Sequence, residues 1–462
     1  MPVDRERLRD TAKYLRGVRP LDPEELSDYV EADHRVVALA LRDEAADLGL
    51  IEREDGTFVP ADDAPVTPRF DSVTTFPDGY AFAFEDLLFD EYGRNWQKGD
   101  SGKQLREAIR RLKEDYYRQH PVEYDYEAAL GYGIYHLPDY YAAVQYPLDY
   151  LARDGRIPGD LRVLDVGAGV GGPALGLHDY LPDDTLVDYH AVEPSAAADV
   201  LDPLLDETGP NFHARITRER IEEFDPDGEY DLVMACSVLS ELDDPVAAGE
   251  KLINVLAPDG TLLALAPADR NTSIGLRETE RELEDRGATV YGPTVRFWPG
   301  ERPTDTGWSF DHRPDIEPPG FQRRLAENAP RPSEFLNETV KFSYSLLRTD
   351  GERRYDIALD ESRVAKLADA DSYVPNRVNL LAAKLSANLA DENANPVYKI
   401  SDGSETTDIY AVHVKEDALN AALARAPYGS VLSIEEGLLL WNDDEAAYNV
   451  VVDEDTVVDR AR

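Results

Sequence analysis

The pattern of apolar and polar residues divides the chain into a central α/β region and two ends of different texture. Short apolar runs without polar alternation recur through the centre, as in the buried strands of a parallel sheet. A helix is predicted over Ile274–Arg286, and an antiparallel last strand over Lys341–Arg348. Five more strands are predicted at Arg162–Val166, Val187–Val192, Tyr230–Leu239, Leu256–Pro267 and Ala288–Val295, as the first, second, fourth, fifth and sixth of seven, and the third is not located. This pattern favours an α/β fold with a seven-stranded Rossmann-like core.

The N-terminal end is predicted as three helices followed by a hairpin. The helices are expected at residues 4–16, 21–30 and 34–48, and the hairpin turns at Asp55-Gly56. Such an arrangement resembles a winged helix. Its third helix carries Arg35 and Arg42 but also three acidic residues, which argues against readout of the DNA major groove. We favour a module that docks protein or RNA over a sequence-specific DNA reader.

The C-terminal end has the texture of a small barrel. Strands are predicted at 378–389 and 407–414, a hairpin at 402–403, a helix at 416–425 and two last strands around 442–444. This order resembles an OB-fold, which commonly binds single strands or partner proteins. Four aromatic residues are candidates for stacking on bases: Tyr398, Tyr410, Trp441 and Tyr448. Filling of the barrel core is the favoured role of these side chains, and protein docking stays open.

A glycine-rich turn follows the first predicted strand of the central region. The stretch LRVLDVGAGVGGPALG, Leu161–Gly176, is typical of a strand, a tight turn and a helix. Its glycines expose backbone N–H groups and a helix N-terminus to a ligand. Gly167, Gly169 and Gly172 also fit the fingerprint of nicotinamide and flavin enzymes, so the turn alone does not identify that ligand.

Two acidic residues favour S-adenosylmethionine over a dinucleotide. Asp165 stands two residues before the first glycine, where a carboxylate suits a cationic amino-acid ligand and repels a pyrophosphate. Glu193 follows the second strand, where a carboxylate can accept ribose hydroxyls. Together with the strands, these features resemble the S-adenosylmethionine-dependent methyltransferase fold. A nicotinamide-binding Rossmann domain is the alternative.

The expected cofactor site is built from the glycine turn and the ends of two other strands. Ser195 is expected to cap the next helix, and Cys236 to be buried packing. Ser237 and Glu241 are weak catalytic candidates, so a domain that binds its cofactor for structure or sensing stays open. The cofactor-binding candidates are Asp165, Gly167, Ala168, Gly169, Gly171, Glu193, Pro194, Cys236 and Ser237.

The predicted domains follow from these patterns. They are a winged-helix-like module (1–65), a helical lead-in (66–158), a methyltransferase core (159–350) with an irregular insertion (296–338), a linker (351–375) and an OB-fold-like barrel (376–456).

Composition indicates where the protein works and excludes some kinds of site. The formal net charge is −45, and only 10 of the 48 basic residues are Lys, as in proteins of a salt-saturated cytoplasm, where self-repulsion is screened. A single cysteine excludes internal disulfides and a thiolate metal cluster held by this chain alone. No apolar run approaches 18 residues, so we expect a cytoplasmic protein outside the membrane.

One stretch is basic within this acidic chain. Ser101–His120 has a net charge of +3, and four of its cations recur at helical spacing on one face. A basic stripe in an acidic protein suggests a phosphate contact, and a solvated face with internal ion pairs is the alternative. The RNA-binding candidates are Lys103, Arg106, Arg110, Lys113, Arg323 and Arg324.

Three stretches resemble a narrower family, the methyltransferase-like assembly proteins of the mitochondrial small ribosomal subunit and their prokaryotic relatives. They are LPDYYAAVQYPLDYL (137–151), VMACSVLSEL (233–242), and WSFDHRPDIEPPGFQRRL (308–325) with KFSYSLLR (341–348). The resemblance covers about residues 69–350 and implies S-adenosylmethionine and a role with small-subunit ribosomal RNA, as methyltransferase or assembly factor. A methyltransferase for a small molecule or protein, and a non-enzymatic accessory factor, are the alternatives.

Many members of that family carry cysteines in the insertion that bind an iron–sulfur cluster. Here the matching positions read PTVR (293–296) and WSF (308–310), so no iron–sulfur cluster is expected. Packing of Trp298 and Trp308, with ion pairs from Arg296 and Arg313, is the hypothesis for what holds the insertion instead.

Overall fold

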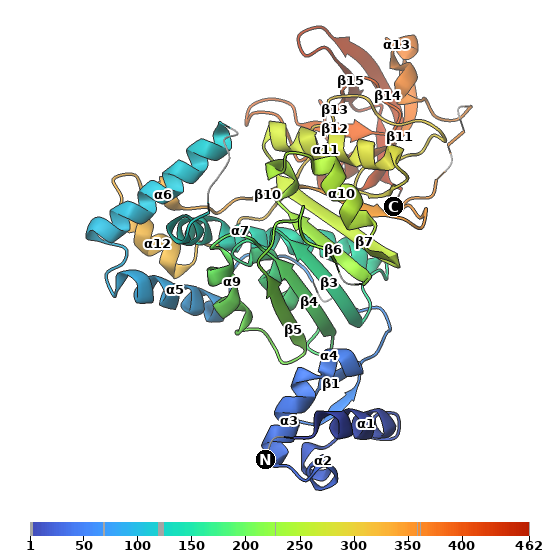
Figure 1. Ribbon diagram of the computed structural model, residues 1–462. Coiled ribbons are helices and arrows are strands. Elements are labelled where there is room, and N and C mark those ends of the chain that lie inside the picture. Colours follow the sequence, from blue (N-terminus) through green and yellow to red (C-terminus); the bar gives the residue numbers. More distant parts are fainter. Residues whose placement is uncertain are drawn as a thin grey trace. The chain divides into compact units, whose positions relative to one another are not determined.

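The computed structural model describes residues 3–67, 70–118, 124–226, 228–357, 359–360 and 362–461 (Figure 1). The last predicted residues of the basic stretch, 119 and 120, lie outside the described residues. The chain divides into two compact units. The first contains Met1–Cys236 and Pro314–Val340, and the second contains Ser237–Arg313 and Lys341–Arg462.

The N-terminal module has the predicted helices and hairpin. Aspartates cap three of the helices: Asp4, Asp22 and Asp33 each accept a first-turn backbone N–H. The helix predicted at 34–48 is interrupted at Glu44, which is buried and ion-paired with Arg9. The elements are α1 (Arg5–Leu15), α2 (Pro23–Val30), α3 (His34–Asp43), α4 (Ala45–Leu48), β1 (Leu50–Glu52) and β2 (Phe58–Pro60).

The hairpin of this module joins it to the rest of the first unit. The backbone N–H of Glu52 donates to Oδ1 of Asn211 at 2.7 Å, and Nδ2 of Asn211 donates back to the Glu52 carbonyl at 3.1 Å. Ile51 and Val59 pack against Leu186 in a small apolar cluster. The winged-helix-like module is therefore docked on the sheet by its wing strands.

Three helices precede the sheet, and one helix of the insertion packs with them. They are α5 (Asp78–Tyr92), α6 (Gly99–Tyr117) and α7 (Tyr126–Arg153), with α12 (Gly320–Glu327) beside α5 and α6 in Figure 1. The prediction that 296–338 is irregular is thus wrong in part, because the insertion also holds β9 (Asp311–Arg313) and a 3-10 helix, η2 (Pro332–Phe335). The apolar face of α12 is buried, with Phe321 4.9 Å from the Phe84 ring.

The parallel strands of the Rossmann-like core lie in the first unit. Their order is β5-β4-β3-β6, and each neighbouring pair is parallel. Two crossover helices follow the first two strands. The elements are β3 (Asp160–Val166), α8 (Gly172–Tyr180), β4 (Leu186–Val192), α9 (Ala198–Leu205), β5 (Phe212–Thr217) and β6 (Tyr230–Cys236).

The remaining core strands lie in the second unit in the order β7-β10-β8, antiparallel throughout, with β9 on β10. Strand β8 is shorter than predicted because Pro293 has no N–H to continue the ladder. The elements are η1 (Leu239–Glu241), α10 (Pro245–Ile253), β7 (Leu256–Pro267), α11 (Arg270–Asp285), β8 (Thr289–Gly292) and β10 (Val340–Arg348). The strand orders of the two units confirm the predicted methyltransferase core.

The C-terminal end is a closed five-stranded barrel, as predicted. Its order is β11-β12-β13-β15-β14, β11 also pairs with β14, and β13 and β15 are parallel. A further strand, β16, pairs antiparallel with the first part of β14. The elements are η3 (Leu367–Asp369), α13 (Ala370–Tyr373), β11 (Arg377–Lys384), β12 (Val397–Ser401), β13 (Ile409–His413), α14 (Ala422–Arg425), β14 (Val431–Asn442), β15 (Ala447–Val452) and β16 (Val457–Arg460).

Two sequence predictions for the barrel needed correction. The helix predicted at 416–425 forms only over α14, because side chains of Asp417 and Asn420 accept nearby backbone N–H groups and compete with the helix. Core filling is confirmed for Tyr398, which is buried in the barrel core. It is wrong for Trp441, which is 42% exposed and lies 4.8 Å from the Tyr448 ring.

The first part of the insertion packs against this barrel within the second unit. The Trp298 indole donates to Oδ2 of Asp402 at 2.7 Å, and the Thr304 N–H donates to the Glu405 carbonyl at 2.8 Å. Lys399 of β12 is buried between Asp305 and Asp408. The Lys399 side of β12 is therefore covered by the protein's own chain.

Among the described residues, no helix is long and apolar enough to span a bilayer.

Candidate functional site

The glycine turn after β3 adopts a backbone that requires glycine. Gly167, Gly169 and Gly171 have φ values of +66°, +55° and +96°, which side chains rarely adopt. A Cβ on Gly171 would lie 2.7 Å from Cδ1 of Leu201, whereas a Cβ on Gly169 would meet only a carbonyl at 3.9 Å. Gly171 therefore serves packing against α9, and Gly169 leaves an open surface.

Asp165 is fully buried directly before this turn. Its Oδ2 accepts the hydroxyl of Tyr189, while its Oδ1 has no hydrogen-bond partner among the described residues. Burial raises the pKa of Asp165 to about 7, with Glu193 adding to the shift and the Tyr189 bond opposing it. Since buried polar atoms nearly always have partners, this oxygen marks a place where a donor is expected.

Glu193 faces the glycine turn, as its predicted role requires. Its Oε2 accepts the Gly169 N–H at 2.9 Å, and its Oε1 accepts the Ser195 N–H at 2.9 Å. Each carboxylate oxygen can accept a second hydrogen bond, so the side chain is held in place with acceptor capacity to spare. Its binding of ribose hydroxyls stays a prediction.

The other predicted site residues lie in the turn after β3, on the loop after β4 and at the end of β6. Pro194 is exposed, and Ala168 is buried in the turn. The expectation that Ser195 caps α9 is wrong: its hydroxyl accepts the Ala197 N–H at 3.1 Å, but α9 begins after Ala197 without a side-chain cap. Its bond closes the turn before the helix.

Cys236 is the last residue of β6, and Ser237 and Glu241 lie on the segment that follows it. Cys236 is buried, as predicted, and burial together with Asp165 raises the pKa of its thiol. Ser237 has a φ of +62°, and its N–H donates to the Leu265 carbonyl at 2.7 Å. Glu241 is exposed at the end of η1, and Asp244 is the residue that caps α10. A catalytic role of Ser237 or Glu241 stays a prediction.

These features fit S-adenosylmethionine. The turn supplies open backbone at Gly169, Asp165 supplies a carboxylate oxygen for a cationic group, and Glu193 supplies acceptors for hydroxyls. A dinucleotide would bring phosphates toward a buried carboxylate, which electrostatic repulsion disfavours. The residues therefore match a charged amino-acid nucleoside better than a pyrophosphate.

The basic stripe of α6 is largely engaged with the protein itself. Arg106 is buried and donates to the Leu325 carbonyl at 3.4 Å, and Arg110 donates to Glu334 at 2.7 Å. Lys113 donates to the Glu334 carbonyl, and burial lowers the pKa of Lys113 to about 8. Lys103 is 70% exposed and 3.7 Å from Glu107. The stripe thus anchors the stretch that holds α12 and η2.

The remaining RNA-binding candidates lie on α12. Arg323 pairs with Glu317 at the surface, and Arg324 pairs with Glu85 of α5. RNA binding by these six cations stays a prediction.

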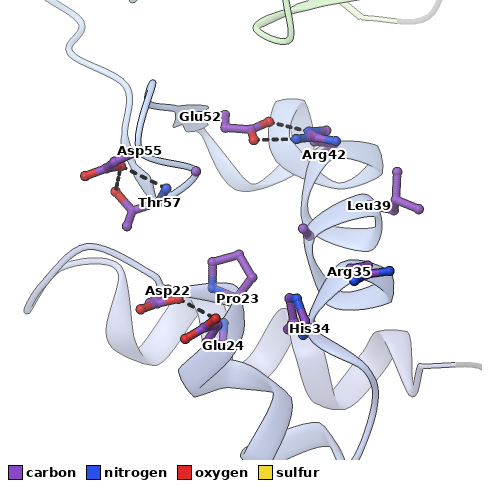
Figure 2. Close-up of a pocket in the computed structure, with 12 residues that line it drawn as sticks. Asp22, Pro23, Glu24, His34, Arg35, Leu39, Arg42, Glu52, Asp55 and Thr57 are labelled. Atoms are coloured by element: carbon purple, nitrogen blue, oxygen red, sulfur yellow. Dashed lines mark hydrogen bonds and ion pairs between the residues drawn. The ribbon is translucent and has the colours of Figure 1, made fainter.

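The N-terminal module carries a hollow of about 650 Å³ (Figure 2). It is lined by α3, the start of α2 and the hairpin turn. Figure 2 shows Arg42 of α3 and Glu52 of β1 joined in a two-bond ion pair at one edge of the hollow. Leu39 on the same helix is 57% exposed. Arg42, one of the two basic residues of this helix, is thus paired within the module.

The hypothesis for the insertion is confirmed for Trp298, Trp308 and Arg296, whereas the ion pair of Arg313 lies within β9. Trp298 is buried, the Trp308 indole donates to the Ala268 carbonyl at 3.5 Å, and Arg313 pairs with Asp311 at 2.8 Å. Arg296 pairs with Glu284 at 2.8 Å. Among the described residues, no group of three or more His, Cys, Asp or Glu side chains is placed to hold a metal ion. Absence of an iron–sulfur cluster stays a prediction.

Sequence reasoning missed several residues of this region. Tyr189, the partner of Asp165, could have been found from the sequence, because a tyrosine within a buried strand needs a hydrogen-bond partner for its hydroxyl. Asn337 and Gln322 bond to α7, and nothing local in the sequence marks them. The Lys399 pair with Asp305 joins residues 94 positions apart, which no sequence pattern indicates.

Comparison with known proteins supports the methyltransferase assignment of the core. Residues 164–262 match a family described as a methyltransferase domain. Residues 5–54 and 368–461 match the N-terminal and C-terminal domains of a domain of unknown function, DUF8157. No match was found among curated protein sequences.

Several solved methyltransferases are similar to the chain. The plantazolicin methyltransferase BpumL, in complex with SAH, is 14% identical over 58% of this chain and 99% of its own, with a TM-score of 0.31. The mitomycin 7-O-methyltransferase MmcR is 16% identical over 62% and 89%, with a TM-score of 0.27. The sugar N-methyltransferase KedS8 from Streptoalloteichus sp is 22% identical over 27% and 47%, with a TM-score of 0.22. The family match and the strand order together assign a Rossmann-like methyltransferase core to this chain.

Proposed function

We propose that this protein is an S-adenosylmethionine-dependent methyltransferase that acts on a small molecule. The observation that carries the proposal is the buried Oδ1 of Asp165, which has no partner among the described residues and lies beside the glycine turn. An ammonium group of the methyl donor would satisfy this oxygen and stabilise the ionised carboxylate.

The residues would divide the donor between them. The open surface at Gly169 would take the methionine part, and Glu193 the ribose. Transfer of a methyl group from a sulfonium is an in-line displacement, which needs an oriented nucleophile and a site poor in water. The high pKa of Cys236 argues against a thiolate nucleophile.

A small molecule is favoured over RNA by the state of the basic stripe. Arg106, Arg110 and Lys113 already bond to the chain's own residues, so they offer little to a phosphate backbone. Action on or beside small-subunit ribosomal RNA is the second candidate. It is supported by the resemblance of residues 308–325 and 341–348 to the ribosomal assembly family, and by the exposure of Lys103.

The test is transfer of labelled methyl from S-adenosylmethionine in molar potassium chloride, where self-repulsion of the acidic chain is screened. A cell extract separated into small molecules, RNA and protein serves as acceptor. Label in the small-molecule fraction is expected. Label in ribosomal RNA would select the second candidate, and no label in any fraction would contradict methyl transfer.

A further inference from the structure

A row of side chains on α7 lies beside the glycine turn. A Cβ on Gly172 would lie 3.0 Å from Cβ of Tyr140. Just before the same helix, the Ala196 N–H donates to the Tyr124 carbonyl at 3.3 Å. The first half of α7 therefore runs along the glycine turn that follows Asp165 and along the loop that contains Glu193.

Three rings recur on this part of α7 at a spacing of one turn. The His136 ring is 4.9 Å from the Tyr132 ring and 5.7 Å from the Tyr140 ring. The planes of Tyr132 and Tyr140 are 13° from parallel, and their centroids are 6.3 Å apart. All three residues are partly exposed. Together they present ring surfaces on which a planar aromatic compound can stack.

A proline shapes the backbone next to His136. Pro138 lacks the N–H that would bond the Ile134 carbonyl in a regular helix. Nε2 of Gln322 donates to that carbonyl at 2.7 Å, and Nδ2 of Asn337 donates to the Tyr135 carbonyl at 3.1 Å. The interruption of α7 is thus filled by two side chains of the Pro314–Val340 stretch, which hold this turn in place.

The same turn contains an oriented histidine. Nδ1 of His136 is 3.2 Å from Oδ2 of Asp139, which also accepts Nδ2 of Asn337 at 2.8 Å. Oδ1 of Asp139 accepts the Tyr140 N–H at 2.9 Å. A carboxylate acceptor favours the tautomer with the proton on Nδ1, which leaves a lone pair on Nε2. Within the part of the chain that the structure describes, Nε2 has no hydrogen-bond partner.

We propose that His136 is the general base of the acceptor site and that the site takes a planar aromatic compound with an ionisable hydroxyl, stacked on Tyr132 and Tyr140. Asp139 and Asn337 are positioning residues. This inference rests on the proposed methyltransferase function. The hydroxyl proton passes to Nε2, the freed oxygen pair forms a bond to the methyl carbon of S-adenosylmethionine, and the electron pair of the broken C–S bond stays on sulfur as a neutral thioether.

Among the described residues, the titratable and polar groups near His136 come from α7, α6 and the Pro314–Val340 stretch. Asp139, Tyr132, Tyr135 and Tyr140 face it from α7. From α6, Nζ of Lys113 lies 3.6 Å above the Tyr135 ring. From the Pro314–Val340 stretch, neutral Asn337 contacts Asp139.

The first test needs no methyl donor. 4-Nitrophenol is titrated against the protein in molar potassium chloride, and the absorption band of the phenolate reports ionisation of the bound phenol. His136→Gln should raise the apparent pKa of bound 4-nitrophenol by about one unit relative to wild type, because the base that accepts its proton is gone. His178→Gln is the matched control, since His178 also pairs with an aspartate but uses both ring nitrogens. Failure of 4-nitrophenol to bind wild type, or equal ionisation in wild type and His136→Gln, would overturn the inference.

The second test separates the base from a structural role. Labelled methyl transfer from S-adenosylmethionine is measured with catechol, whose hydroxyls are neutral near pH 8, and with 4-nitrophenol, which is mostly ionised there. His136→Gln should lower transfer to catechol by about 10²- to 10⁴-fold and change transfer to 4-nitrophenol by less than about tenfold. Equal losses with both acceptors, or none with either, would overturn the role of His136. If wild type binds no S-adenosylmethionine by calorimetry, the proposed function itself fails, whatever the 4-nitrophenol titration shows.

Discussion

Asp165 in the first unit and Asp305 in the second are both buried aspartates, yet their surroundings shift the two pKa values in opposite directions. Burial raises the pKa of Asp165 to about 7, because only the Tyr189 hydroxyl opposes it. Burial also acts to raise the pKa of Asp305, but Lys399 and Arg281 outweigh it and lower that pKa. A buried charge whose partners are all supplied by the chain has a structural role. A buried oxygen without a partner instead suggests that a ligand supplies the missing donor.

The same contrast separates whole regions. Around the barrel, Lys399 contacts Asp305 and Asp408, and Arg281 donates to Asp305 at 2.7 Å. These bonds fix the insertion on β12. At the glycine turn, the surface at Gly169 is filled by no side chain. The expectation that the glycines expose their N–H groups is wrong for Gly167 and Gly169, because these donate to the Val192 carbonyl and to Glu193. We therefore interpret the ion pairs around the barrel as structural, and we propose ligand binding for the glycine turn.

The largest effect is expected from removing the paired aspartate. Asp305→Ala leaves Lys399 with one partner fewer in a buried site and should lower the free energy of unfolding by about 3–5 kcal/mol. Urea unfolding in molar potassium chloride measures it. Glu454→Ala, which removes an exposed partner of Lys415, is the control and should cost less than about 1 kcal/mol. If Asp305→Ala lowers the free energy of unfolding no more than Glu454→Ala does, the structural role of the Asp305 pair is contradicted.

Replacing the unpaired aspartate should affect binding and leave the fold intact. Asp165→Asn removes a desolvated carboxyl whose Oδ1 has no partner, so unfolding should change by less than about 1 kcal/mol. Affinity for S-adenosylmethionine should fall by about 10- to 100-fold, since a charge-assisted hydrogen bond contributes about 1.5–3 kcal/mol. Calorimetry and urea unfolding of one preparation report both quantities. Unchanged affinity would mean that Asp165 does not touch the donor.

The raised pKa of Asp165 predicts that binding depends on pH. Below pH 7 the carboxyl of the free protein is protonated, and a cationic ligand must displace that proton. The dissociation constant for S-adenosylmethionine should therefore rise about tenfold for each pH unit from 7 down to 5, and level off above 7. Asp165→Asn should flatten the profile. A wild-type profile that is flat from pH 5 to 7 would contradict the assignment.

The smallest effect is expected on the basic stripe. Arg110 is half exposed in its pair with Glu334, so Arg110→Ala should lower the free energy of unfolding by no more than about 1 kcal/mol. Affinity for S-adenosylmethionine should not change. Lys103→Ala is the matched control, because Lys103 only faces Glu107 of its own helix and should have no measurable effect. A loss of donor binding in Arg110→Ala would show that the stripe acts on the cofactor site.

Local patterns were enough to predict the elements that depend on neighbouring residues. The strand 256–267 and the glycine turn at 167–172 were both readable, because apolar runs and glycine spacing are short-range signals. The helix predicted at 416–425 failed where Asp417 and Asn420 bond to backbone, and α12 was missed because its apolar face spans only two turns.

The candidate site was readable only in part. Asp165 and Glu193 were found because their distances from the glycines are fixed by the strand and turn. The support of α7 by Gln322 and Asn337 crosses nearly 200 residues of chain, so no spacing rule reaches it. The basic stripe looked like a phosphate site because sequence gives charge but not the partner, Glu334, that uses it.

The central claim is that the glycine turn with Asp165 and Glu193 binds S-adenosylmethionine, and isothermal titration calorimetry in molar potassium chloride tests it most directly. The account predicts one site per chain in wild type, and no binding after Gly169→Asp, which places a side chain and a further carboxylate, beside those of Asp165 and Glu193, on the open surface at Gly169. No heat of binding in wild type, or equal affinity in Gly169→Asp, would contradict it.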